Sequence, residues 1–160
     1  MVIWMRTIDE LITDSPTFAG LEPAQLEFIA GCGRNEHIGA GTMLMREAEP
    51  AERFWLIRRG VVALELYVPG REPLVIETLE PGDVVGWSWL FPPYRWALDG
   101  RAHGDCHLIT FDGVCLRQKC EADHDLGFEL MTRFANDLVG RLQATRLQLA
   151  DVYGNVAAAG

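Results

Sequence analysis

The pattern of hydrophobic and polar positions changes its period twice and divides the chain into three regions. Residues 7–14 and 21–30 carry apolar side chains at helical spacing. Residues 34–112 form short apolar or alternating runs that glycine and proline separate. A helical period then returns in residues 114–154. We predict one domain over residues 1–160, with short helices in 1–33, a β region in 34–112 and C-terminal helices in 114–154.

The β region contains eight candidate strands with no helical run between them. Gly60 and Pro69-Gly70 are examples of the turns that separate them. Short strands at even spacing are typical of an antiparallel sandwich or barrel. The predicted fold class is mainly β with flanking helices: an eight-stranded antiparallel jelly-roll β-barrel with short N-terminal helices and a long C-terminal helix. The expected strands are 35–38, 42–47, 53–59, 61–68, 74–79, 83–87, 96–102 and 106–111.

The long C-terminal helix carries a second apolar pattern, with spacings that alternate between four and three residues. Such a heptad seam predicts contact with another helix. Because this helix extends beyond one small barrel, we expect a homodimer through the seam, while Phe128, Phe134 and Val139 pack on the helix's own barrel. The alternative is that the whole helix packs on its own barrel. The seam consists of Met131, Ala135, Leu138, Leu142, Thr145, Leu149 and Val152.

Composition and charge argue against several classes of partner. The chain has 49% hydrophobic and 23% charged residues and a net charge of -9, which is typical of a globular protein that repels phosphate backbones and anionic lipids. No apolar run reaches the roughly 20 residues of a membrane helix. Charged residues interrupt the N-terminal stretch MVIWMRTIDELI, so it does not resemble a signal peptide. We expect a cytoplasmic protein with no membrane contact and no direct binding to DNA.

The cysteine and histidine spacings do not indicate a metal or catalytic site. None of the four cysteines forms a CxxC pair, which structural zinc sites usually contain. We expect four thiols, buried or at the surface, because the cytosol keeps thiols reduced. His103 and His107 are four residues apart, without the close His-x-His pair of metal-dependent cupins. We therefore predict no metal and no enzyme activity. The four cysteines are Cys32, Cys106, Cys115 and Cys120.

One segment, residues 86–102, is unusually aromatic: GWSWLFPPYRWALDGRA. Large aromatic side chains most simply belong to a core. However, this segment is rich in proline and polar at its ends, and its indole and phenol groups need hydrogen-bond partners. Such a composition also suits an ordered loop around a partly enclosed pocket.

Two further stretches carry a family resemblance: MLMREAEPAERFWLIRRGVVALEL at residues 43–66 and TLEPGDVVGW at residues 78–87. Together with Arg101-Ala102, they resemble the cyclic nucleotide-binding domain of the catabolite activator and FNR-like regulators. The resemblance implies a phosphate-binding cassette that starts at Gly86. In the family, backbone N–H groups at a helix start and an arginine bind the cyclic phosphate, and a glutamate binds the ribose.

The cassette departs from the family pattern at both of those side chains. Trp87 stands where the family has its glutamate, and Trp96 stands where it has its arginine. Arg95, one position earlier, reaches the phosphate if the cassette carries one extra residue; otherwise it points to the opposite face. Arg101 is the second arginine that we consider for the phosphate contact. The expected ligand-binding residues are Gly86, Trp87, Ser88, Trp89, Arg95, Trp96 and Ala97.

Two functions therefore remain open. The first is a non-enzymatic sensory module that binds cyclic AMP, cyclic GMP or another small ligand and repositions the C-terminal helix. The second is a structural or interaction dimer whose pocket is plugged by its own tryptophans. In the family, the long helix leads to a DNA-reading helix-turn-helix. The sequence ends shortly after the seam, so we expect an unknown protein partner to carry the output.

Overall fold

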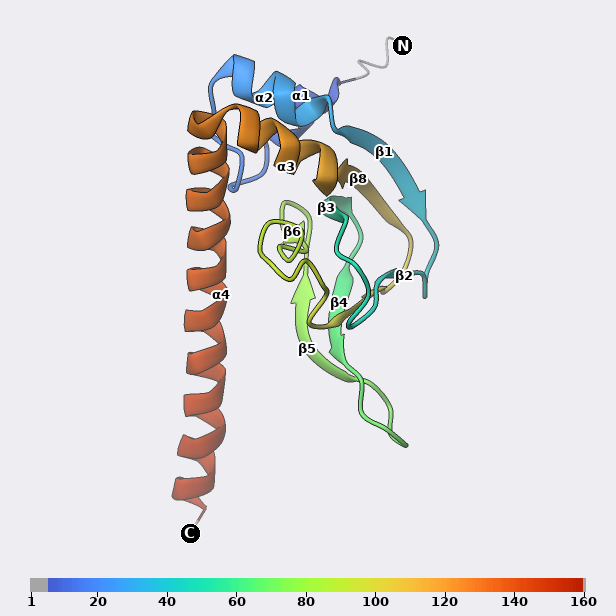
Figure 1. Ribbon diagram of the computed structural model, residues 1–160. Coiled ribbons are helices and arrows are strands. Elements are labelled where there is room, and N and C mark those ends of the chain that lie inside the picture. The colour runs from blue at the N-terminus through green and yellow to red at the C-terminus, as the bar shows by residue number, and fades with distance from the viewer. Residues whose placement is uncertain (1–5, 160) are drawn as a thin grey trace.

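The computed structural model describes residues 6–159, so the first five residues of the N-terminal stretch lie outside it. Two four-stranded sheets form the body of the molecule. The short helices α1, α2 and α3 gather at one end of the sheets, and the long helix α4 runs along one side (Figure 1). The hairpin of β4 and β5 projects at the end opposite the short helices (Figure 1).

The first sheet has the strand order β1-β8-β3-β6, and all of its pairs are antiparallel. Its central register places Phe54 opposite Phe111 and Leu56 opposite Ile109. The strands are β1 (Gly33–Ile38), β8 (Cys106–Asp112), β3 (Arg53–Arg59) and β6 (Val84–Val85).

The second sheet has the order β2-β7-β4-β5 and is also antiparallel. Its strands are β2 (Met43–Met45), β7 (Asp99–Ala102), β4 (Val62–Leu66) and β5 (Leu74–Leu79). Mainly β structure with flanking helices is thus confirmed, and all eight expected strands form. They pair as two separate sheets, and within residues 6–159 no ladder joins the sheets into a closed barrel.

The helices begin where the sequence supplies caps. Asp112 accepts a hydrogen bond from the Cys115 amide at the start of α3, and Asp123 does the same for Leu126 at the start of α4. Helix α4 continues through Gly154, so the predicted end at 154 is wrong; one glycine costs only about 1 kcal/mol in a helix. Within the described chain, no helix is long and apolar enough to cross a membrane. The helices are α1 (Ile8–Ile12), α2 (Pro23–Ala30), α3 (Gly113–Ala122) and α4 (His124–Ala158).

Strand β3 supplies two cores because successive side chains on a strand point to opposite faces. Phe54 faces the helices, where its ring stacks on those of Phe111 and Trp89 with centroids 4.6 Å apart. The next residue, Trp55, faces the other way and contacts Trp96, with 5.9 Å between ring centroids. The aromatic segment 86–102 therefore contributes one tryptophan to each core.

Helix α4 meets the first core through Leu126, Leu130 and Phe134, all of which are buried. Phe134 was expected there. Phe128 and Val139 were also expected to pack on the sheets, but this is wrong: their side chains are 71% and 52% exposed. The buried residues recur every four positions and define one helix face, and the other two lie off that face.

A disulfide joins Cys32, at the end of α2, to Cys115 in α3, with 6.1 Å between their Cα atoms. The prediction of four thiols is therefore wrong for this pair. Cys106 and Cys120 are free. The two bonded residues are 83 positions apart. The pairing of β1 with β8, which places Gly33 opposite Phe111, brings Cys32 close to the start of α3 and so to Cys115. A disulfide typically stabilises a fold by roughly 2–4 kcal/mol.

Candidate functional site

The cassette between β6 and β7 starts at a glycine that no other residue could replace without a shift. Gly86 has φ of +89°, and a Cβ added there would lie 2.8 Å from the ring of Trp96. Such a distance is shorter than any ordinary carbon contact. The absence of a side chain at Gly86 thus lets the edge of the Trp96 indole lie close to the backbone at the start of the cassette.

Trp96 fills the space between the two sheets. Its side chain is 6% exposed and lies against Trp55. Its backbone is held on both sides by the loop before β3: its N–H donates to Glu49, and its carbonyl accepts from Ala48. The ring is therefore a fixed part of the inner core.

Beside the Trp96 ring a cavity of about 20 Å³ remains. Small-molecule sites usually measure about 300–1,000 Å³, so in this conformation the cavity has room for about one water molecule. Its walls are largely apolar. It is lined by Met45, Leu64, Gly86, Trp87, Ser88, Trp96, Ala97 and Leu98.

Five of the seven expected ligand-binding residues line this cavity, and two do not. Arg95 is exposed, and its Nη1 donates to the carbonyl oxygen of Ala48 at 2.8 Å. Arg95 and Trp96 are neighbours in extended backbone, so their side chains point to opposite sides. Arg101, the second arginine considered for the phosphate contact, does not line the cavity either: its Nε lies 3.2 Å from the buried carboxylate of Glu65. A contact between any of these residues and a ligand stays a prediction.

Trp89 belongs to the first core and not to the cavity. Its side chain is fully buried, and its ring stacks on Phe54. Its carbonyl oxygen accepts a 2.5 Å hydrogen bond from Arg117 on α3, and that guanidinium also lies 4.1 Å from the ring centroid of Tyr94. Arg117 therefore binds the cassette to α3, a role that sequence reasoning missed.

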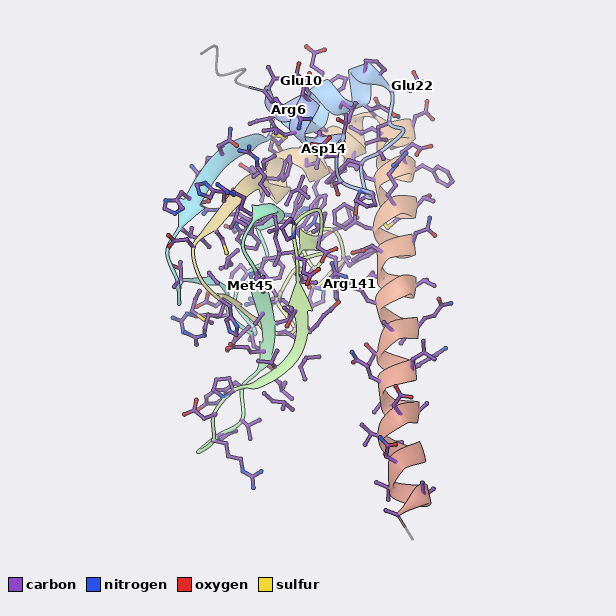
Figure 2. The ribbon with its side chains drawn as sticks, turned by 180° about the vertical axis from the view of Figure 1, so that it is seen from behind. Arg6, Glu10, Asp14, Glu22, Met45 and Arg141 are labelled. Atoms are coloured by element: carbon purple, nitrogen blue, oxygen red, sulfur yellow. A yellow bond between two sulfur atoms is a disulfide. The ribbon has the colours of Figure 1, made fainter. Side chains whose placement is uncertain are left out.

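Arg141 is the corresponding link between the cassette and α4. Its Nη2 donates to the carbonyl oxygen of Val84 at 2.5 Å, and its Cζ lies 5.0 Å from the ring centroid of Trp87. Figure 2 shows this side chain reaching from α4 toward the sheets. Only 12% of it is exposed. Sequence reasoning missed it because the search followed apolar residues, although Arg141 continues the face of Phe134 and Asp137 at helical spacing.

Two carboxylates share the Arg141 guanidinium. Asp137 lies 3.1 Å from Nη2, and Glu77 on β5 lies 3.7 Å from Nε. Burial raises the pKa of both carboxyls, although the charge of Arg141 acts in the opposite direction. The Nη1 atom of Arg141 is buried and has no hydrogen-bond partner. This small network is therefore partly buried and incompletely satisfied, and a buried polar group without a partner is costly.

His103 and His107, which are four residues apart in the sequence, do not meet at a common site. His103 contacts Glu65 at 3.4 Å, whereas His107 stacks on His37 with 4.6 Å between centroids. Over residues 6–159, no group of three or more His, Cys, Asp or Glu side chains is arranged to hold a metal ion.

A family profile described as the cyclic nucleotide-binding domain matches residues 35–123, which is more than half of the chain. The matched region contains both sheets apart from the first residues of β1, the whole cassette and α3. The chain belongs to the cyclic nucleotide-binding domain family. Domains of this family are mostly regulatory and not catalytic.

Solved structures agree with this family. A protein described as a cyclic nucleotide-binding protein of Geobacter metallireducens GS-15 is 27% identical, with a TM-score of 0.76 over 86% of this chain and 99% of that one. The catabolite activator protein of Thermus thermophilus is 20% identical, with a TM-score of 0.67 over 85% of this chain and 62% of that one. The regulatory domain of Toxoplasma gondii PKA, solved with cAMP, is 20% identical, with a TM-score of 0.62 over 70% and 42%. The last two show the fold alone. No curated protein matches the chain.

Proposed function

We propose that this cyclic nucleotide-binding domain is a non-enzymatic sensory module in which the cassette at residues 86–98 responds to a small ligand and α4 carries the response. One observation supports this above all: Arg141 connects α4 to both ends of the Val84–Trp87 segment. A ligand that moves this segment has to break or reorganise contacts of a buried guanidinium.

The energy available to this coupling is of a useful size. A hydrogen bond to a charged group contributes about 1.5–3 kcal/mol, and allosteric coupling energies are typically about 1–3 kcal/mol. Loss of the single hydrogen bond from Arg141 to Val84 is therefore enough to change the equilibrium between two positions of α4 by a measurable factor. Arg117 gives the cassette a second connection, to α3.

The ligand class we propose is a cyclic nucleotide, cyclic AMP or cyclic GMP. Support comes from the family match over residues 35–123 and from the cAMP-bound Toxoplasma neighbour. Because the present cavity is about 20 Å³, binding requires the Trp96 ring to leave the space between the sheets. A ligand would then replace apolar contacts with Trp55 by its own contacts.

The second candidate is an interaction module whose pocket is permanently plugged. The small cavity beside Trp96 favours it.

Both candidates use a homodimer through α4, which we propose from the exposed seam: Leu142, Leu149 and Val152 are 50%, 52% and 60% exposed. Helix α4 extends beyond the β4–β5 hairpin (Figure 1), so the sheets of the same chain do not cover its last turns.

Thermal unfolding of the wild-type chain with cyclic AMP and with cyclic GMP distinguishes the two candidates. A ligand at 100 times its dissociation constant stabilises the fold by about 2.7 kcal/mol. A rise in melting temperature with a change in tryptophan fluorescence would support the sensory module. A response of Trp96→Ala alone would support the plugged module, since the wild-type ring then blocks the site. No response in either protein would contradict cyclic nucleotide binding.

The link through Arg141 is tested separately by hydrogen exchange. In Arg141→Gln, we expect faster exchange of the amides at residues 84–87, because the cassette loses its contact with α4. Arg146→Gln is the matched control, since Arg146 lies on the same helix and is exposed. Equal exchange at residues 84–87 in the two variants would refute the proposed coupling.

A further inference from the structure

A second cavity lies on the face of the first sheet opposite to Trp96, the face that also carries Phe54. It measures about 490 Å³ and is bounded by α1 and the loop after it, the end of β3 and the turn before β6. Figure 2 shows two of its lining residues, Arg6 and Asp14, at the α1 end of the molecule. Its volume falls within the range of small-molecule sites.

An irregularity in β3 directs two consecutive arginines to this cavity. Ile57 pairs with Leu108, but the next pair joins Arg59 to His107, so Arg58 is an extra residue in the strand. In a regular strand, successive side chains point to opposite faces. A bulge removes that alternation and re-aims a side chain. Both Arg58 and Arg59 consequently line the same cavity, together with His107.

The charge in the cavity is positive, although the chain as a whole carries -9. Asp14 is its one acidic lining residue, and this carboxylate is occupied by Arg6 at 2.6 Å. Arg58 bonds the neutral amide oxygen of Asn35 at 3.0 Å. Among residues 6–159, neither Arg58 nor Arg59 forms an ion pair with a carboxylate. Two guanidinium groups therefore face the cavity without a compensating negative charge.

The remaining walls are apolar or already bonded. Leu11, Leu56 and Pro81 line the cavity. The Ser15 hydroxyl donates to the Gly82 carbonyl and so is engaged within the protein. The cavity thus combines a cationic side with an apolar side, a combination that suits an amphipathic anion.

We propose that this cavity binds a small organic anion in which a phosphate or carboxylate group is attached to an apolar body. The planar guanidinium groups match the paired oxygens of such a group and donate to them in a bidentate manner. The apolar body would lie against Leu11, Leu56 and Pro81. This site is separate from the cassette, and the proposal does not depend on the proposed function.

The test uses the full chain and phenyl phosphate as the probe, followed by NMR of backbone amides. We expect saturable shifts at residues 56–59, 82 and 107, which line the cavity and carry a backbone N–H. The variant Arg58→Gln/Arg59→Gln should bind at least about tenfold more weakly, the loss expected when a charge-assisted hydrogen bond is removed. Arg71→Gln, an exposed arginine in the β4–β5 turn, is the charge-matched control and should bind as the wild type does.

Further ligands and a second variant separate the contribution of the anionic group from that of the apolar body. Benzoate and inorganic phosphate should compete with phenyl phosphate, and inorganic phosphate should bind more weakly because it lacks the apolar body. If the double variant fails to fold, Arg59→Lys replaces it; this variant keeps the charge but loses the bidentate geometry, and several-fold weaker binding is expected. The proposal is overturned if no shifts saturate at these amides, or if the variants bind phenyl phosphate as tightly as the Arg71 control. Nucleotide-induced shifts at residues 86–98 report on the cassette independently.

Discussion

Replacing Trp96 by alanine is the most direct test of the filled cassette. A buried tryptophan removes about 150–250 Å² from water, and Trp96 is only 6% exposed. At about 25 cal/mol per Å², this area corresponds to roughly 4–6 kcal/mol. Residual burial in the unfolded chain lowers such figures by about 10–40%. We therefore expect Trp96→Ala to reduce the free energy of unfolding by about 3–5 kcal/mol, in the range typical of core tryptophans.

Urea unfolding followed by far-ultraviolet circular dichroism measures this loss without relying on tryptophan emission. Phe128→Ala is the control, because that aromatic side chain is 71% exposed on α4 and should change stability by no more than about 0.5 kcal/mol. Added indole should stabilise Trp96→Ala but not the wild type, since it can occupy the apolar space left between the sheets.

Two results would refute this reasoning. One is a loss below about 1 kcal/mol, with the slope of the free energy of unfolding against urea concentration unchanged. It would mean that the Trp96 ring is not packed in the core, since even modest core truncations usually cost more. A loss in Phe128→Ala equal to that in Trp96→Ala would mean that exposure in the monomer does not predict the effect. The latter outcome would instead place Phe128 in a contact between copies of the chain.

Three further predictions concern titration, the disulfide and assembly. Burial raises the folded pKa of Asp137, so the stability that its protonated form contributes is present below its usual value of 3.8 and is lost as pH rises through the raised value. Asp137→Asn should therefore lose less melting temperature over that window, and identical profiles would contradict the shift. When the chain is unfolded without reductant, only two of its four cysteines should react with a thiol reagent, because Cys32 and Cys115 are paired. Reaction of all four cysteines would exclude the disulfide. Reduction should cost roughly 2–4 kcal/mol of stability. Leu142→Glu should convert a dimer to a monomer in light scattering, whereas Leu147→Glu, 69% exposed and off the seam, should leave it intact; a wild-type monomer would refute the dimer.

Strand positions were predictable because they depend on local pattern. The runs 53–59 and 74–79 coincide with β3 and β5 as the structure has them. Alternation and turn residues act over a few positions, so they can be read without knowledge of the tertiary structure. The pairing of the strands was harder to predict from the sequence. Whether eight strands close into a barrel or form two sheets depends on contacts between strands that are distant in the chain.

The location of the cassette was also predictable, but the orientation of its side chains was not. Gly86 and the aromatic residues after it mark the segment from sequence alone. Which of Arg95 and Trp96 points inward depends on the register against residues 48–50, since a shift of one residue exchanges the two faces. The structure directs the indole into the core and the guanidinium outward.

The amino-acid sequence by itself determined the order of elements, the family and the segment where a ligand site is expected, because these follow from short-range periodicity and contiguous motifs. Only the tertiary structure decided that Trp96 fills the space between the sheets, that Cys32 meets Cys115 and that Arg141 connects α4 to the cassette. These contacts join residues far apart in the chain. They depend on how strands pair, how the cassette packs between the sheets and how helices dock on them, and no local pattern of residues encodes that arrangement.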